Sequence, residues 1–453
     1  MPLGWRNPCG LLLASLVLST AACSGSDTSR VALIGATVIS GSGSPPIPNA
    51  VVLINGTTIE VVGPRDSVSI PRGAEEIDLT GRWIIPGLID ADARAEPWAL
   101  SRYLGYGVTA IRDVHSDTKT VAAMADETAM IVVLGPHIYF SGTPIGNPGA
   151  NTTLSATEAR RLVDDNALAG SDYIALGAEA TIGQVRAVTD EASSFQLPVV
   201  ASLGLTDAIS ATNAGIHSIV GLTGIPQAAA GSSAPFYAAY RQGFYQGWRE
   251  TGRSWSRLRP ATLDRIARQL VEGYVSLTPT LVKHEISANL DDLSAFPGPD
   301  PGAVPSAVLE QWDGPAIMRE RGWSAVDLRT FRQGRAVQDR FVVEFKDLGG
   351  AVAAGSGAPG PFLLPGASLH AELHQLVMAG FSPMDALMAG TSTAAAVLGA
   401  DSLGTIGPGN VADLLVLTAN PLQDIRNTRS IETVVLRGNL MLVETIRAQW
   451  SEQ

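Results

Sequence analysis

Short apolar runs alternate with helix-like segments through the middle of the chain, and this alternation limits the possible folds more than any other feature. Parallel βα units have this order, because each strand is followed by a helix that covers the sheet. The apolar runs lie at 84–90, 108–112, 137–140, 173–176, 198–201, 218–220, 275–278 and 351–354. Eight parallel strands are what a (β/α)8 TIM-type barrel requires, and 453 residues suffice for that barrel and a small second domain. The predicted fold class is therefore α/β, with the barrel spanning 84–402.

Two helix starts support this order. Ser155 and Glu158 have the spacing of a capping box, in which each side chain bonds the other residue's backbone N–H. Ser382 precedes Pro383, and Asp385 follows in what would be the first turn. An N-cap serine, a proline at the first helical position and an early acid are typical of a helix N-terminus.

Both ends of the chain have a β-type pattern. The apolar runs there lie at 31–39, 50–54, 58–62, 412–417 and 431–436. Asn55 and Gly56 separate two of these runs, which is a strong signal for a tight hairpin. We predict one composite β-sandwich made of 30–83 and 403–448, with the barrel inserted between its two halves.

The first 22 residues have the pattern of a signal peptide. Arg6 supplies a positive charge, and the apolar stretch 11–22 is too short to span a bilayer. Small residues precede Cys23, which resembles a bacterial lipoprotein processing site and implies that Cys23 carries a lipid and that 23–29 form a linker. Ser24 would then favour the outer membrane, facing the periplasm. An ordinary cleaved signal peptide, with an incidental cysteine and a periplasmic product, stays open.

The net charge of −12 and a pI near 5.0 argue against nucleic acid or an anionic membrane surface as a partner. Membrane contact is expected only through the lipid anchor. Cleavage before Cys23 would remove Cys9, which leaves no pair for a disulfide. A small-molecule ligand and a homo-oligomer are both compatible with this composition.

One predicted strand leads directly into a polar site. The apolar run passes through a turn at 86–87, and Asp90, Asp92 and Arg94 then alternate with alanines, so that three charges lie on one strand face. This stretch resembles the first barrel strand of the amidohydrolase superfamily, whose pattern is Pro-Gly-Leu-Ile-Asp-x-His-x-His. Asp92 and Arg94 stand where that pattern has its two histidines.

Later segments extend the resemblance over roughly 30–445. Segments 404–417 and 420–425 are similar to the C-terminal signature of the family. Segments 365–373 and 382–387 are similar to its imidazolonepropionase and Xaa-Pro dipeptidase-like branch. The resemblance implies hydrolysis of non-peptide or Xaa-Pro dipeptide carbon–nitrogen bonds, with zinc or another divalent metal activating water.

Members of this family hold their metal at strand ends with a His-x-His pair, often a carboxylated lysine, two further histidines and an aspartate. Carried over residue by residue, these positions are Asp92, Arg94, Ala175, Ser202, Gly221 and Gly357. Only Asp92 retains a strong ligand group, since Arg94 has no lone pair to offer. None of the six histidines falls on these positions. We therefore expect a degenerate site, with no catalytic residue, no metal ligand and no cofactor.

The leading hypothesis is a non-hydrolytic pseudoenzyme that retains a small-molecule pocket, because fold does not imply function. The alternative is an active hydrolase with a relocated site that uses Asp92, Asp113, His115 or His284. His115 follows the second predicted strand, where a lone histidine is more often structural than functional. A partner subunit for an active paralogue is a third hypothesis.

Three further expectations concern packing. Arg94 is predicted to neutralise Asp90 and Asp92 as an internal counter-ion, since buried carboxylates need compensation. The aromatic residues between 228 and 345 are predicted mainly to pack at the barrel mouth. His370 lies in a family-like helix and is predicted to pack or cap.

Overall fold

Parallel strands form the centre of the molecule. The computed structural model describes residues 30–147, 154–294, 300 and 302–452, so the predicted signal peptide, Cys23 and the linker lie outside the described residues. Seven of the predicted runs form strands in the described residues: β7 (Leu88–Ala93), β8 (Val108–Asp113), β9 (His137–Phe140), β10 (Ile174–Leu176), β11 (Val199–Ala201), β12 (Ser218–Val220) and β13 (Ser276–Thr278). They make two parallel sheets, ordered β7-β8-β9 and β10-β11-β12-β13.

Isolated parallel bridges connect the edges of these two sheets. Ile145, just after β9, pairs with Leu176 of β10. Leu277 of β13 pairs with Val352, in the eighth predicted run. Ala93 of β7 pairs with Ala358, and the Ala91 N–H donates to the Ala354 carbonyl at 2.9 Å. The eighth run thus lies between β13 and β7.

The prediction of a regular eighth strand at 351–354 is wrong, because that segment makes single bridges and no continuous ladder. Glycines surround it, and they weaken regular pairing. Gly355 also approaches β7 closely, since a Cβ there would lie 2.7 Å from the Asp92 nitrogen. The segment is therefore held by close backbone packing.

The prediction of one strand over 84–90 is also wrong. The run divides into β6 (Trp83–Pro86) and β7, which belong to different sheets. Gly87 lies at the division and donates its N–H to the Asp413 carbonyl at 2.8 Å. A Cβ at Gly87 would lie 2.1 Å from the Thr109 hydroxyl, so the chain can change sheets here only with glycine.

The two ends of the chain meet in two further sheets. One contains β1 (Arg30–Ile34), β3 (Ala50–Asn55), β4 (Thr58–Pro64) and β5 (Glu75–Asp78), in the order β4-β3-β1-β5. The other contains β2 (Thr37–Val38), β6, β14 (Leu414–Leu417), β15 (Ile431–Leu436) and β16 (Asn439–Leu442), in the order β16-β15-β14-β6-β2. The predicted hairpin is confirmed, because Asn55 pairs with Thr58 across Gly56. Leu33 and Val52 from the first sheet share a buried cluster with Ile84 and Leu414 from the second.

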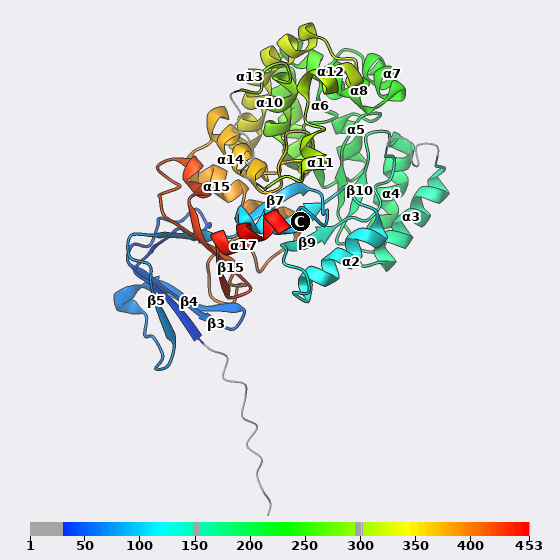
Figure 1. The fold of residues 1–453 in the computed structure, drawn as a ribbon. Helices are drawn as coiled ribbons and strands as arrows, with labels where there is room; N and C mark the ends of the chain where they lie inside the picture. Colours follow the sequence, from blue (N-terminus) through cyan, green and yellow to red (C-terminus); the bar gives the residue numbers. More distant parts are fainter. Residues whose placement is uncertain (1–29, 148–153, 295–299, 301, 453) are drawn as a thin grey trace, which may run out of the picture.

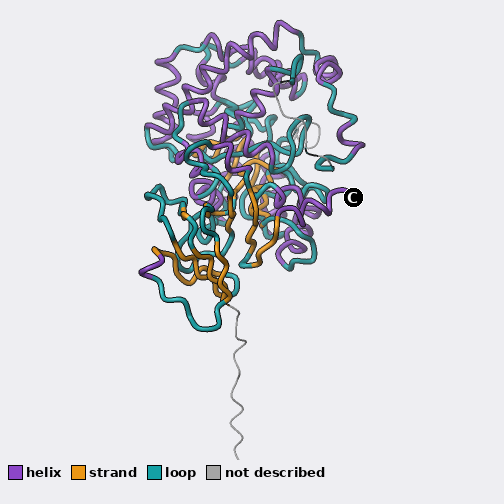
Figure 2. The backbone as a smooth tube through the Cα atoms, turned by 60° about the vertical axis from the view of Figure 1, so that its left-hand side comes forward, coloured by secondary structure: helices purple, strands orange, loops and turns teal. Residues whose placement is uncertain are grey.

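Helices surround the parallel strands, as the purple and orange segments of Figure 2 show. They are α1 (Leu100–Gly105), α2 (Thr118–Ala129), α3 (Ala156–Leu168), α4 (Ile182–Ser194), α5 (Ala208–Asn213), α6 (Ile225–Ala229), α7 (Ala234–Gln242), α8 (Phe244–Ser254), α9 (Pro260–Glu272), α10 (Leu281–Ala288), α11 (Ser306–Leu309), α12 (Gly314–Arg321), α13 (Ala325–Asp347), α14 (Ala367–Ala379), α15 (Pro383–Ala389), α16 (Ser392–Leu398) and α17 (Val443–Ala448). Both predicted helix starts are confirmed: Ser155 and Glu158 form a capping box at α3, and Ser382 caps α15 with Pro383 at its first position.

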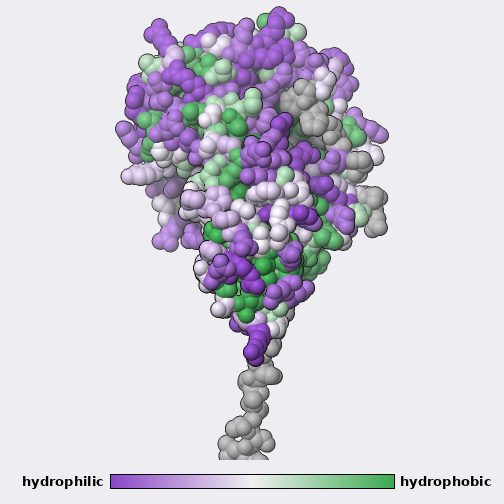
Figure 3. Space-filling view, turned by 90° about the vertical axis from the view of Figure 1, so that its left-hand side faces the viewer, coloured by the Kyte–Doolittle hydropathy of each residue, from purple (hydrophilic) through white to green (hydrophobic). Residues whose placement is uncertain are grey.

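The largest apolar cluster joins the parallel strands to these helices. Ile174, Ile219 and Leu277 are buried together with Val185 of α4 and Ile266 of α9. Burial of apolar surface is the main force that holds such layers together, and it fixes the positions of the strand ends. In Figure 3, hydrophilic residues dominate the broad helical end, and apolar residues gather towards the narrow β-rich end. No described helix is both long and apolar enough to cross a membrane.

Candidate functional site

A cavity of about 470 Å³ opens at the carboxyl ends of the parallel strands. Its wall contains five of the residues singled out from the sequence: Arg94, His115, Ala175, Ser202 and Gly357. Asp92 is completely buried behind this wall, where Gly357 would bring a Cβ within 3.5 Å of Oδ2. Gly221 lies at the end of β12 outside the lining, and its carbonyl accepts a bond from His284. The six positions that the family pattern assigns to metal ligands therefore lie in or beside one cavity.

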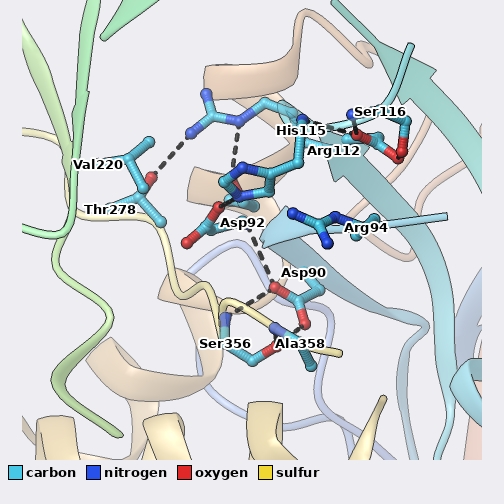
Figure 4. A network of polar contacts seen from close by, with 12 residues as sticks. Asp90, Asp92, Arg94, Arg112, His115, Ser116, Val220, Thr278, Ser356 and Ala358 are labelled. Carbon is cyan, nitrogen blue, oxygen red and sulfur yellow. Dashed lines mark hydrogen bonds and ion pairs between the residues drawn. The ribbon is translucent and has the colours of Figure 1, made fainter. Parts of the chain in front are cut away.

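Asp92 and His115 form the central polar contact of this site. The His115 Nε2 lies 2.8 Å from Asp92 Oδ1, and Figure 4 shows the imidazole directly above the carboxylate. Oδ2 has no hydrogen-bond partner among the described residues. Burial alone would raise the pKa of Asp92, but His115, Lys283 and Arg112 together hold it below its ordinary value. Asp92 is therefore an ionised carboxylate stabilised by neighbouring positive groups.

The predicted counter-ion role of Arg94 is wrong. β7 ends at Ala93, so Arg94 no longer follows the alternation of that strand. Its side chain is 45% exposed, and its ion pair is with Glu96, at 3.8 Å. No dashed line in Figure 4 joins Arg94 to Asp90 or Asp92.

Asp90 is neutralised differently from Asp92. It accepts hydrogen bonds from the backbone N–H and hydroxyl of Ser356 at 2.8 and 2.5 Å. Burial raises its pKa to about 7, so that a large fraction is protonated near neutral pH. Asp90 therefore needs no arginine partner.

Arg112 is a buried cation that sequence reasoning missed. Its Nε donates to the Ala91 carbonyl at 2.7 Å, and Nη2 donates to the Thr278 hydroxyl at 3.0 Å. It lies completely buried on β8 and links that strand to β7 and β13. The available signal was a charged residue at the end of the run 108–112, one position before Asp113.

Asp113 lies close to the site, but both of its carboxylate oxygens already accept hydrogen bonds from nearby residues. Its carboxylate accepts from the backbone N–H groups of Ala95, His115 and Ser116 at 2.6, 2.8 and 2.9 Å. The Ser116 hydroxyl adds a fourth bond at 2.6 Å. These bonds hold the loop that carries His115, so Asp113 has a positioning role.

His284 is buried away from the cavity. Its Nε2 donates to the Gly221 carbonyl at 3.0 Å, and its ring stacks on Trp248 with centroids 4.9 Å apart. Burial lowers its pKa to about 3, which makes it neutral at physiological pH. His370 is also buried, with one nitrogen on the Thr428 hydroxyl and the other on the Tyr106 carbonyl, as its predicted packing role requires. Of the histidines proposed for a relocated site, only His115 lines the cavity.

Several lining residues come from the irregular region and were not predicted as ligand contacts. They are Phe244, Tyr245, Trp248, Lys283, Ile286, Arg321 and Trp323. The only sequence signal for Lys283 is that it follows the run 275–278 by a few residues, where barrel sites are found. Arg321 ends α12, far from any predicted strand, and nothing in the sequence pattern indicated it.

The described residues do not fit a metal of the kind the family uses. They contain no group of three or more His, Cys, Asp or Glu side chains that could hold a metal ion. Zinc sites use three or four such ligands. The surroundings of Asp92 include the cations Lys283 and Arg112, which would repel a divalent ion. We therefore derive no chemical step through a metal.

Comparison with known proteins supports the resemblance found in the sequence. The Amidohydrolase family model matches residues 354–441, which include the family-like segments at 365–373, 382–387 and 404–425. The predicted superfamily is confirmed. No curated protein sequence matches the chain.

Solved structures share the fold of this chain. A putative prolidase from Bifidobacterium longum has a TM-score of 0.68 and 24% identity over 94% of this chain and 99% of that one. A Xaa-Pro dipeptidase with bound methionine has a TM-score of 0.67 and 17% identity, covering 91% and 100%. A bottromycin amidohydrolase has a TM-score of 0.70 and 19% identity, covering 93% and 89%. These likenesses establish a mixed α/β fold.

The expectation that the chain needs no cofactor is wrong in the light of these comparisons. The matched family and the structural neighbours are typically metal-dependent hydrolases, so metal dependence is typical of the proteins that this chain resembles. The side chains around Asp92 do not match the metal dependence of these relatives. They include cations, and the described residues contain no group of three or more metal ligands.

Proposed function

We propose that this amidohydrolase-superfamily protein binds a small molecule in the strand-end cavity and does not hydrolyse it. This proposal rests on one observation: the family's metal ligands and its proton-accepting aspartate are replaced here, while the cavity that they would line is present. Ala175, Ser202 and Gly357 line that cavity, where they provide space and no strong Lewis base. Arg94 is exposed at its rim.

The pocket itself supports retention of a binding role. A volume of about 470 Å³ is in the range of small-molecule sites, and its lining mixes aromatic rings with a few charged groups. A chain that had lost both catalysis and binding would be free to fill this space with larger side chains. The cavity is open, with glycine and alanine at several positions.

We further propose that residues 84–402 form a closed (β/α)8 barrel and that 30–83 and 403–448 form a composite β-sandwich. The three isolated bridges support the barrel, since they lie at the gaps between the two parallel sheets. The apolar cluster shared by the two terminal sheets supports the sandwich. This arrangement would place the cavity at the catalytic face of a barrel.

The sequence of the first 29 residues supports export as a lipoprotein with lipid on Cys23, held in the cell envelope at the periplasmic face of the outer membrane. Nucleic acid is not a proposed partner, and self-association is compatible with the proposal. Labelling of growing cells with radioactive palmitate is expected to mark the protein. Labelling that persists in Cys23→Ala would contradict anchoring at this residue.

The function is tested with the mature chain from residue 24. It is incubated with Xaa-Pro dipeptides and N-acyl amino acids, with and without added zinc or manganese, and amine release is measured. No release above an uncatalysed control is expected. Turnover that rises with added metal would contradict the proposal and restore the ancestral activity.

The second candidate is a hydrolase with a relocated site, and one observation favours it. A buried aspartate that orients a pocket histidine is an arrangement used for general-base catalysis. This candidate predicts turnover that is lost in His115→Asn and independent of added metal. The same substrate panel therefore separates it from both a binding protein and a metal-dependent enzyme.

A further inference from the structure

We infer that the cavity binds an oxyanion carried on a flat apolar body, with Lys283 and Arg321 as the groups that recognise its charge. This inference rests on the proposed function, because it treats the occupant of the pocket as a ligand. It adds the chemical class of that ligand, which neither the family match nor the neighbouring structures assign to this chain.

The first argument is the charge of the lining. Arg94, Lys283 and Arg321 contribute cationic side chains to the cavity wall, and no aspartate or glutamate lines it among the described residues. Asp92 is behind the wall, and its Oδ1 is already paired with His115. The protein as a whole carries a net charge of −12, so a cavity of positive sign is a local exception to its surface. A concave site lined by one sign of charge attracts ligands of the opposite sign.

The second argument is the state of Lys283. Its Nζ lies 5.3 Å from the centre of the Trp248 ring, and it has no ion pair within the described part of the chain. Asp92 is near enough to act on it electrostatically without forming a direct bridge. A cation–π contact leaves the ammonium group without a directly bonded counter-ion, and this state is costly for a half-buried cation. An anion entering the cavity would remove this cost.

Arg321 is held in a similar way by two other rings of the aromatic cluster. Its guanidinium carbon lies 4.2 Å from the Tyr245 ring centre and 5.1 Å from that of Trp323. Among the described residues it has no carboxylate partner. Stacking fixes the plane of the guanidinium, which is how arginine is prepared to bind a carboxylate or phosphate with two hydrogen bonds.

The aromatic residues define the rest of the ligand. Phe244, Tyr245, Trp248 and Trp323 all line the cavity, and Phe244 lies 5.4 Å from Tyr245 and 5.9 Å from Trp248 between ring centres. Rings of this kind bury a planar or apolar body well. The sequence predicted that these aromatics serve mainly as packing, and in the structure they also form part of the wall of the cavity.

The test uses four probes that share a phenyl body: phenylacetate, phenyl phosphate, phenylacetamide and phenethylamine. Titration calorimetry on the full mature chain is expected to show binding of one or both anions at least about tenfold tighter than of the neutral amide. Phenethylamine is expected to produce no binding heat. The comparison between the two anions distinguishes a carboxylate ligand from a phosphate ester, and either preference supports the inference.

Variants assign the effect to the two cations. Lys283→Gln and Arg321→Gln are each expected to weaken anion binding about tenfold and to leave phenylacetamide binding unchanged. Arg321→Lys keeps the charge and is expected to retain the preference for anions, which guards against a failure of Arg321→Gln to fold. The matched control is Arg268→Gln on α9, an exposed arginine outside the cavity.

Equal affinity for phenylacetate and phenylacetamide would overturn the inference, and so would anion binding that survives in both glutamine variants. The same holds if none of the four probes binds. In each of these cases the substrate panel still reports independently on hydrolysis. Failure of the ligand class and failure of the proposed function are therefore separate results.

Discussion

The buried carboxylates near the cavity are each stabilised by a different means. Asp92 is ionised and is held by His115, whereas Asp90 is bonded to Ser356 and has a pKa raised by burial to about 7. Glu372 is also buried and accepts the Val282 N–H at 2.7 Å. Burial raises the pKa of Glu372 to about 8. These differences determine which substitutions and which pH values change stability.

His115→Ala is expected to lower the free energy of unfolding by about 1–3 kcal/mol, because it leaves the buried Asp92 carboxylate without its hydrogen-bonded partner. Arg94→Ala is the contrasting variant and is expected to cost less than about 0.5 kcal/mol, since its side chain is exposed and its ion pair is long. Urea unfolding of both variants measures these values. A larger loss in the Arg94 variant would restore the counter-ion interpretation that the geometry rejects.

Stability is expected to fall as the pH rises from about 5 to about 8. The folded state keeps protons on Asp90 and Glu372 at pH values where the unfolded chain, with ordinary values of 3.8 and 4.5, has lost them. Raised folded pKa values contribute stability at low pH that is lost as the pH passes through the folded values.

Glu372→Gln mimics the protonated acid, so it is expected to flatten this dependence and to gain about 1 kcal/mol or more relative to the unmodified protein at pH 8. Glu310→Gln at an exposed position is the control and is expected to leave the slope unchanged. The urea midpoint as a function of pH is the measurement. An identical slope in the Glu372 variant would show that this acid is not protonated in the folded protein.

At the scale of elements, the division between β6 and β7 directs the chain from the terminal sheets into the parallel strands. Gly87 makes this possible because Thr109 lies against its Cα. Gly87→Ala is expected to destabilise the protein by about 1–3 kcal/mol, since threonine is β-branched and cannot move aside easily. Adding Thr109→Ala should recover part of the loss, and a double-mutant cycle in urea measures the recovery. Simple additivity of the two substitutions would mean that the contact is not the cause.

The elements were largely predictable, and the exceptions have physical reasons. Strands such as 137–140 and 218–220 were predicted at their observed bounds, because apolar runs between turns and helices have few alternatives. The sheet change at Gly87 depends on a tertiary contact with Thr109, and no local pattern reports it. For the same reason, the sequence indicated which metal ligands are absent but not that Lys283 and Arg321 would line one cavity, since they come from different helices of an irregular region.

At the scale of the whole molecule, a polar junction ties the C-terminal strands to the parallel strands. The His137 Nε2 lies 2.9 Å from Asp413 Oδ2, and Arg437 donates to the His137 Nδ1 at 3.2 Å. Arg437 also donates to the carbonyls of Thr128 and Ala129 at 2.7 and 3.0 Å, at the end of α2. This junction connects the C-terminal strands to β9 and to the helix α2 that precedes it.

Arg437→Ala is expected to reduce the free energy of unfolding by about 1–3 kcal/mol, because it removes the donors to acceptors on α2 and β9. Arg426→Ala, an exposed arginine bonded only to nearby Asp424, is the control and is expected to cost less than about 1 kcal/mol. Limited proteolysis is expected to cleave the Arg437 variant faster between the C-terminal strands and the rest of the chain. Equal cleavage of the two variants would argue that the apolar cluster alone holds the junction.

The blue N-terminal and red C-terminal parts of the chain lie side by side in Figure 1, and the pairing of β6 with β14 has a consequence for the time course of folding. Arg82 bonds Glu432 across 350 positions of sequence, so the residues at the start of β6 leave the ribosome long before the C-terminal strands of the same sheet. Contacts of such separation are slow to form, because loop closure must precede any gain from burial. β1, β3, β4 and β5 can pair with one another early, whereas β6 stays without its β14 neighbour until late in synthesis. A chaperone that shields exposed β-strands would be expected to act on this segment first.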